Sequence, residues 1–358
     1  MKILKILLIL LLPLFAYLLL WPVPVDPQSW TPAAAPSLTE GPYATNDKLR
    51  AVERLAEGYG VGPEAIKVDV QGRLVTGYLD GRVVRFDANG ENPLVLANTG
   101  GRPLGISFDN QGNIIVADAR KGLLRIVNGQ VEVLTNSADG LDFGFTDDVD
   151  RDRSGRRFYF SDASSKFHFG EHMADAIEHG AHGRLLRYDL DTKKTEVLLK
   201  DLHFANGVAL GPDDAYVLVN ETTEYKITRY WIKGDKAGTH DTFVENLPGY
   251  PDNVTFNGHD HFWVALFAPR DPMLDKMLPP GHEWLRKLVF RLPEAAHPKP
   301  VMHGFAVALD TNGKLVENLQ DAAAGAYAPI TSVYETPKAL YLGSLSNTAI
   351  GRLSLPLP

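Results

Sequence analysis

A short pattern of strand, turn and strand recurs along most of this sequence, and it restricts the possible fold more than any other feature. Each copy is an alternating apolar run, a turn rich in Asp, Asn and Gly, and a second, more apolar run. The six copies occupy residues 65–90, 105–134, 149–164, 208–232, 254–267 and 330–355. Copies at this spacing are typical of an array of four-stranded units, and antiparallel units of this kind close into a ring. The sequence therefore predicts an all-β fold, a single six-bladed β-propeller. The alternative, an array of β-sandwiches, would need linkers that the sequence lacks.

The expected propeller domain covers residues 46–358. Residues 46–58 are expected to supply the outer strand that closes the last blade. Two segments, 165–182 and 271–290, have helical patterns and follow the second strand of their units. They are expected to be insertions on one face of the propeller, where lids and membrane-facing elements usually lie.

The first 25 residues form an apolar segment of the kind that spans membranes. Lys2 and Lys5 precede an apolar run that begins at Ile6 and continues to Val25. This run just reaches the roughly 20 residues that a spanning helix needs. Lysines before such a run hold that end in the cytoplasm. Trp21 stands where an interfacial aromatic residue would.

A cleaved signal peptide is the alternative interpretation of this segment. The only small-residue stretch, residues 33–35, lies far beyond the apolar run and is followed by Pro36, which is a poor cleavage context. We therefore predict an uncleaved single-pass transmembrane signal-anchor over residues 1–25 and a linker over 26–45. The propeller is then expected on the extracytoplasmic side of the membrane.

Composition excludes several classes of function. The net charge is -8 and no basic run is present, so a nucleic acid partner is not expected. The chain has no cysteine, which rules out thiol catalysis, zinc–thiolate sites and disulfides. No phosphate-binding glycine loop, G-x-S-x-G elbow or dinucleotide-binding fingerprint occurs either.

Polar residues stand just before the first strand of each copy. They are Glu64, Arg102, Asp147 with Asp148, Asn206, Asp252 with Asn253, and Thr331 with Ser332. Because the first strand of each propeller blade lines the central channel, these side chains are expected to converge. A ring of carboxylate and amide oxygens is what Ca²⁺ requires. At any single position, Asp or Asn before a strand can simply be a turn former, but recurrence at one register favours a site.

Several longer stretches resemble one known group of proteins. They include "GRPLGI" (101–106), "FTDDVD" (145–150), "HGRLLRYDLDTKKTEVLL" (182–199), "FANGVAL" (204–210), "LPGYPDNV" (247–254) and "YLGSLSNTAIGRL" (341–353). On these motifs the chain resembles the gluconolactonase/paraoxonase superfamily, in particular its strictosidine-synthase-like, adipocyte plasma membrane-associated protein branch. The resemblance covers about residues 40–358 and implies a six-bladed propeller with Ca²⁺ in the channel.

The resemblance also implies a ligand set and an activity, the hydrolysis of esters or lactones. The calcium ligands of the superfamily fall on Glu64, Asn206, Asp252 and Asn253. A fifth falls on Asp147 or Asp148, with Asp147 preferred. In lactonase members the metal polarises the ester carbonyl, and the aspartate that matches Asp252 can act as base for a water.

Other catalytic roles follow from chemistry and position. Asp252, or a carboxylate at 147–148, would take the proton of the water. Arg102 would hold the developing oxyanion or form a structural ion pair. His203, three residues before Asn206, is a candidate general base at the mouth of the channel.

The sequence departs from its relatives at two places. One position of the paraoxonase histidine pair falls on Leu104, so that pair is missing. The stretch 325–334 lacks the glutamate with which strictosidine synthase condenses an amine and an aldehyde. The leading hypothesis is a calcium-dependent ester or lactone hydrolase, and the main alternative is a non-catalytic, calcium-stabilised binding protein. A condensing enzyme is disfavoured.

Overall fold

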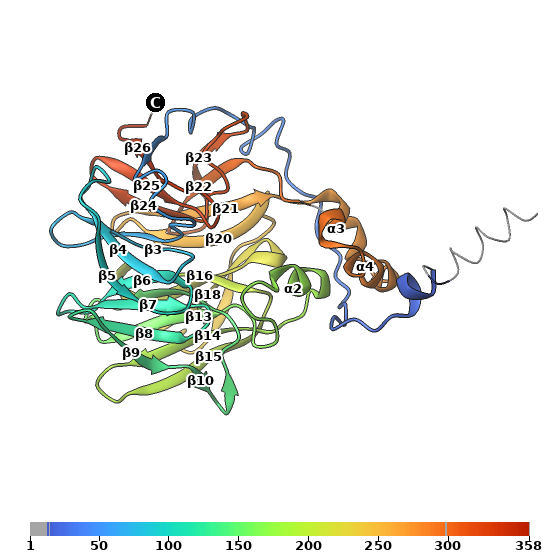
Figure 1. Cartoon of the computed structure of the whole chain (residues 1–358), viewed down its shortest axis with the longest axis horizontal. Coiled ribbons are helices and arrows are strands. Elements are labelled where there is room, and N and C mark those ends of the chain that lie inside the picture. The colour runs from blue at the N-terminus through green and yellow to red at the C-terminus, as the bar shows by residue number, and fades with distance from the viewer. Residues whose placement is uncertain (1–12, 14, 298, 358) are drawn as a thin grey trace, which may run out of the picture.

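Six four-stranded antiparallel sheets make up most of the protein (Figure 1). The computed structural model describes residues 13, 15–297 and 299–357. The first three sheets contain β2 (Ile66–Val68) to β5 (Leu94–Asn98), β6 (Pro103–Phe108) to β9 (Gln130–Thr135), and β12 (Thr146–Arg151) to β15 (Lys194–Leu202). The next two contain β16 (Ala205–Leu210) to β19 (His240–Val244) and β20 (Gly249–Phe256) to β23 (Leu315–Asp321). The sixth has the order β1 (Glu53–Leu55), β26 (Ile350–Ser354), β25 (Ala339–Gly343) and β24 (Ser332–Thr336).

The middle strands of the sheets follow chain order. They are β3 (Leu74–Gly77), β4 (Arg82–Phe86), β7 (Ile114–Asp118), β8 (Gly122–Val127), β13 (Arg157–Asp162), β14 (Gly183–Asp189), β17 (Tyr216–Glu221), β18 (Lys226–Trp231), β21 (His261–Pro269) and β22 (Gly304–Asp310). A small hairpin, β10 (Ser137–Ala138) and β11 (Leu141–Asp142), lies between the second and third sheets in the chain.

The innermost strands of the six sheets form a closed ring. β2 contacts β6, and contacts continue through β12, β16, β20 and β24 back to β2. Large apolar side chains of neighbouring sheets pack together outside this ring, for example Leu218 of β17 with Phe262 and Val264 of β21. The predicted six-bladed propeller is therefore confirmed.

The last blade is completed by a strand from the beginning of the chain. β1 pairs with β26 in an antiparallel register that places Glu53 opposite Arg352 and Leu55 opposite Ile350. The prediction that residues 46–58 close the ring is thus confirmed. The pairing covers the outer edge of β26 and joins the first and last strands of the domain in one sheet.

A recurring aspartate turn joins the first and second strands of several blades. In the first blade, the Asp69 carboxylate accepts hydrogen bonds from the backbone N–H groups of Gln71 and Arg73 at 2.9 and 3.0 Å. Asp109 makes the same pair of contacts one blade later. The Asp, Asn and Gly patterns in the sequence therefore mark turns in which the aspartate side chain stabilises the reversal of the chain through local hydrogen bonds.

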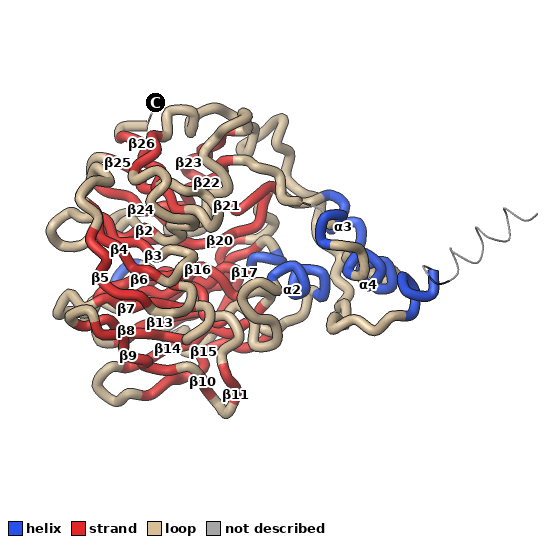
Figure 2. The backbone as a smooth tube through the Cα atoms, in the orientation of Figure 1, coloured by secondary structure: helices blue, strands red, loops and turns tan. Residues whose placement is uncertain are grey.

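Helices gather on one side of the propeller (Figure 2). The two expected helical insertions contain α2 (His172–Glu178), and α3 (Pro272–Met277) with α4 (Glu283–Phe290). Three short 3₁₀ turns cover Pro212–Asp214, Thr222–Glu224 and Glu294–Ala296. α4 contacts both α2 and α3, so the two insertions form one layer.

The expected transmembrane anchor falls largely on residues 1–12 and 14, which lie outside the described residues. Residues 15–20 are helical, and the chain after them has no helix or strand until β1. In the part of the chain that the structure describes, no helix is both long enough and apolar enough to cross a membrane.

Candidate functional site

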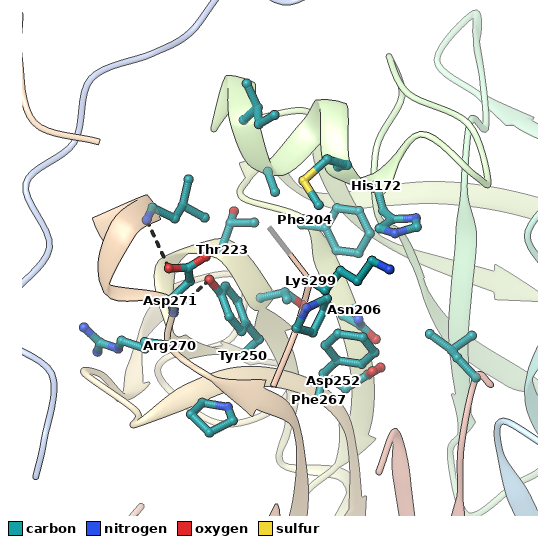
Figure 3. Close-up of a pocket in the computed structure, with 18 of the residues that line it drawn as sticks. His172, Phe204, Asn206, Thr223, Tyr250, Asp252, Phe267, Arg270, Asp271 and Lys299 are labelled. Atoms are coloured by element: carbon teal, nitrogen blue, oxygen red, sulfur yellow. Dashed lines mark hydrogen bonds between the residues drawn. The ribbon is translucent and has the colours of Figure 1, made fainter. Parts of the chain in front are cut away.

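A cavity of about 490 Å³ lies where the inner strands begin, beneath the layer of helices (Figure 3). Four of its lining residues are polar and come from the ends of inner strands: Glu64, Asp147, Asn206 and Asp252. All four side chains are at most 5% exposed. A compact polar centre therefore lies at the bottom of a cavity whose walls are mostly apolar, which is the usual character of a small-molecule site.

Bulges in the inner strands position these residues. The pairing register shifts between Pro103 and Ile106, Thr146 and Val149, Ala205 and Val208, and Pro251 and Val254. A bulge inserts an extra residue and redirects the neighbouring side chains. Because the same irregularity recurs in four blades, side chains from different blades are directed toward one point.

Two glycines allow neighbouring inner strands to approach closely at the bulges. A Cβ on Gly207 would lie 2.5 Å from the Cα of Asn253, and one on Gly105 would lie 2.6 Å from the Cα of Asp148. Any side chain at these positions would push the strands apart. The glycines in "ANGV" and "PLGI" thus keep the ring narrow where the oxygens converge.

The oxygens of the polar centre are short of hydrogen-bond donors. Asn253 donates its Nδ2–H to Glu64 Oε1 at 2.5 Å, which leaves the amide oxygen free. Three buried oxygens accept no hydrogen bond: Glu64 Oε2, Asn206 Oδ1 and Asn253 Oδ1. Buried oxygens without a partner are costly, and a hard cation satisfies several of them together. The donor set, all oxygen from carboxylates and amides, fits Ca²⁺.

Burial and mutual repulsion disfavour negative charge on these carboxylates. Burial raises the pKa of Glu64 to about 8, with Arg102 opposing the rise and Asp148 adding to it. Burial also raises the pKa values of Asp147 and Asp252 well above the ordinary range, and the neighbouring carboxylates add to both increases. A divalent cation at the centre would reverse this balance, because it stabilises the ionised forms.

The two adjacent aspartates of the third blade have different surroundings. Asp147 lines the cavity. Asp148 instead accepts hydrogen bonds from the backbone N–H groups of Val149 at 2.8 Å and Val208 at 2.9 Å. Burial raises the pKa of Asp148 to about 6, while the charge of Lys67 and these backbone contacts oppose the rise. Asp148 therefore joins two inner strands, and Asp147 is the one presented to the cavity.

Arg102 lies behind the polar centre and is not part of the cavity wall. Its side chain is fully buried, and Nη1 donates to the carbonyl of Gly62 at 2.9 Å. Burial lowers the pKa of Arg102, and the carboxylates of Glu64 and Asp147 oppose this effect. The guanidinium is therefore close enough to compensate part of the negative charge of the centre.

His203 also lies outside the cavity lining. Its Nε2 is 3.4 Å from Glu224 Oε1, and its ring stacks on His179 at a centroid distance of 4.6 Å. Candidate ligand atoms of these three residues lie within 4.8 Å of one another. However, the two rings are stacked and Lys226 contacts the Glu224 carboxylate, so the cluster is better suited to packing than to holding a cation.

Most of the cavity wall comes from residues that the sequence analysis did not single out. Aromatic side chains of loops and strands form much of the wall, with aliphatic side chains of the helical layer above them. They include Phe145, Phe169, Phe204, Phe267, Leu274 and Val289. Leu104, which occupies a position of the missing histidine pair, also lines the cavity. The helical insertions were visible in the sequence, but only the fold shows which of their residues face the centre.

Comparison with known proteins agrees with the fold and the motifs. Residues 147–235 match the family model "Strictosidine synthase", and residues 41–86 match "Strictosidine synthase-like, N-terminal". The adipocyte plasma membrane-associated protein of Danio rerio is 35% identical over 370 residues, covering 97% of this chain and 88% of the relative. The chain belongs to the strictosidine synthase-like family. A second relative, protein strictosidine synthase-like 4 of Arabidopsis thaliana, is 35% identical over 342 residues and covers 91% of this chain and 90% of its own.

Solved structures with the same architecture are more distant in sequence. A gluconolactonase from Xanthomonas campestris superposes with a TM-score of 0.61 at 17% identity, covering 93% of this chain and 99% of its own. A regucalcin from Agrobacterium tumefaciens, described as a calcium-binding protein, gives a TM-score of 0.56 at 13% identity, covering 90% of this chain and 94% of its own. At these identities the likeness establishes that this family member shares the propeller fold. The family resemblance found in the sequence is therefore confirmed.

Proposed function

We propose that this family member is a calcium-dependent hydrolase of carboxylic esters or lactones. The observation that supports it is the set of buried, unpartnered oxygens at the floor of an apolar cavity. Glu64, Asn206, Asp252 and Asn253 would hold the ion, with Asp147 as a further ligand. Bound there, Ca²⁺ supplies Lewis-acid polarisation of a substrate carbonyl.

The residues of the chain divide the remaining tasks. Asp252 lines the cavity and, with its carboxylate ionised, accepts the proton of the attacking water. Asp147, which also lines the cavity, is the alternative proton acceptor. The apolar walls hold the acyl part of the substrate and exclude bulk water from the reacting carbonyl. Arg102 balances charge from behind the centre. Because His203 is outside the cavity lining, it is not assigned the role of base.

Hydrolysis of a small panel tests this proposal. The purified full chain would be assayed with phenyl acetate and with short and long lactones, in Ca²⁺ and in chelator. Asp252→Asn keeps the shape of the side chain but removes the base, and we expect it to lose turnover as the chelated protein does. Lys200→Ala, which removes an exposed surface pair with Asp139, is the control and should keep full activity.

The second candidate is a non-catalytic propeller that uses calcium for stability and the cavity for binding. The same oxygens support it, since they would hold the ion whether or not water can attack. No turnover across the panel, together with a calcium-dependent rise in melting temperature, would favour this candidate. A condensing enzyme stays disfavoured, because the stretch 325–334 offers no acid.

We also propose that the N-terminal segment holds the protein at a membrane, with the propeller on the extracytoplasmic side. The apolar run from Ile6 to Val25 supports this, and the Danio rerio relative is named as a plasma membrane-associated protein. Resistance to alkaline extraction from membranes would test the anchor, and protection from external protease would test the orientation. Release by alkali would contradict the anchor.

A further inference from the structure

Large apolar side chains are exposed on the layer of helices that covers the cavity and on the segments joined to it. They are Leu20, Trp21, Met273, Trp284, Val301 and Met302, each 58% to 77% exposed. Together these six residues are called the lid face here. They come from the N-terminal segment, from α3 and α4, and from the chain just before β22. Figure 1 shows α3, α4 and the N-terminal segment projecting together from one side of the propeller.

α4 has an arrangement that is the reverse of an ordinary surface helix. Arg286 is fully buried and donates hydrogen bonds to the carbonyls of Ile177 at 3.0 Å and Gln28 at 2.8 Å. Trp284, two residues earlier, is 58% exposed. A helix that buries its arginine and exposes its tryptophan is poorly matched to water. It is well matched to the membrane interface, where tryptophan is favoured.

The N-terminal segment is fixed to this layer and is not a loose tether. Arg291, at the end of α4, donates from Nε to the carbonyl of Trp21 at 2.7 Å and from Nη1 to that of Leu18 at 3.0 Å. Tyr17 donates its hydroxyl to the carbonyl of Arg291 at 3.1 Å. The apolar run that begins at Ile6 therefore leads directly onto the lid face.

The cavity opens on the same side. Val301 belongs to both the lid face and the cavity wall, and the wall also includes Leu274 of α3 and Val289 of α4. We propose that the lid face docks on the surface of a lipid bilayer, so that the mouth of the cavity meets the lipid and apolar esters reach the site from the bilayer. This docking rests on the proposed membrane location, and adds a second contact beside the anchor.

Single-cysteine labelling tests the docking directly, because the chain has no native cysteine. Met302→Cys and Met273→Cys place a fluorophore on the lid face. Val70→Cys is the matched control: it is 93% exposed, in the turn at the opposite end of β2 from Glu64. Each full-length variant would be reconstituted into phosphatidylcholine vesicles. Quenching by spin-labelled lipid and by aqueous iodide would then be compared.

We expect the Met302 and Met273 probes to be quenched by the lipid label and protected from iodide, with the reverse at Val70. Equal access of iodide to all three probes would overturn the docking. Protection from iodide without quenching by lipid would also overturn it, since a second copy or another protein would then cover the face. Failure to incorporate into vesicles would contradict the anchor and the docking together. Hydrolase activity does not enter this readout, so inactivity would refute the enzyme and leave the docking intact.

Discussion

The carboxylates of the polar centre should make the stability of the calcium-free protein fall as pH rises. Burial raises the pKa of Glu64 in the folded protein from 4.5 to about 8, so the folded state binds this proton more tightly than the unfolded chain does. Stability from this group is then complete below about pH 4.5 and is lost as pH rises toward 8. At about 1.4 kcal/mol per tenfold change in the acid constant, complete ionisation of Glu64 costs about 5 kcal/mol.

This free energy converts into a measurable change in melting temperature. An unfolding entropy of about 2.1 cal/mol/K per residue gives about 0.75 kcal/mol/K for the 358-residue chain. Between pH 5 and pH 8 about 3.5 kcal/mol of this free energy is lost, because the folded group is only half ionised at pH 8. The chelated protein should therefore melt about 5 °C lower at pH 8 than at pH 5, from Glu64 alone. Saturating Ca²⁺ should remove most of this loss, because the ion stabilises the ionised carboxylate, and its benefit should grow with pH.

Scanning calorimetry at pH 5, 6, 7 and 8, in calcium and in chelator, makes this measurement. Glu64→Gln is the matched control, since the amide oxygen can still accept the hydrogen bond from Asn253 but cannot ionise. The variant should show a shallower pH dependence and a weaker calcium response. A chelated wild-type protein whose melting temperature is constant across this range, or a calcium benefit that shrinks with pH, would refute the reasoning.

Three further predictions concern the inner strands, a buried ion pair and the cavity wall. Asp148→Ala should lower the free energy of unfolding by about 1–3 kcal/mol in urea titrations, because two buried N–H groups lose their acceptor. Asp147→Ala should instead weaken the calcium-dependent rise in melting temperature, and equal effects of the two variants would contradict their different placement. Arg184→Met should cost about 3–5 kcal/mol in the same titration, because it leaves Asp162 buried without the guanidinium that donates twice to its Oδ2. A loss similar to that of an exposed pair such as Lys200–Asp139 would count against it. Ala176→Trp should narrow the cavity and lower kcat/KM for long-chain esters more than for phenyl acetate, and a uniform loss across chain lengths would show that Ala176 does not border the acyl site.

The blade number was predictable because its determinants are local. Each aspartate turn is made by residues within about four positions of one another, such as Asp69 and Arg73, so the turn can be recognised from the sequence alone. The convergence of Glu64, Asn206 and Asp252 was predictable for a related reason. Every inner strand begins at the same end of the channel, so residues that stand at equivalent positions before these strands lie close together in the fold.

Other features depend on contacts between distant segments. Which of Asp147 and Asp148 faces the cavity depends on the next blade, because the backbone N–H of Val208 donates a hydrogen bond to Asp148. From its helix alone Arg286 would be interpreted as a solvated charge, and its burial is explained by the carbonyls of Ile177, Glu178 and Gln28. His203 is close to Asn206 in sequence, yet its ring stacks on His179 and lies outside the cavity lining.

The pairing of β1 with β26 has a consequence for how the chain reaches its native state. The two strands are neighbours in space but come from opposite ends of the domain's sequence, so the ring cannot close during synthesis until almost the whole polypeptide has emerged. Contacts between such remote segments form slowly, because the loop between them must first be closed. Until then the outward edge of β26's sheet and the apolar interface between the first and last blades are exposed. A chain that ends before β26 would leave β1 without its partner and the outer edge of β25 exposed, and such chains should be removed by cellular proteases or aggregate.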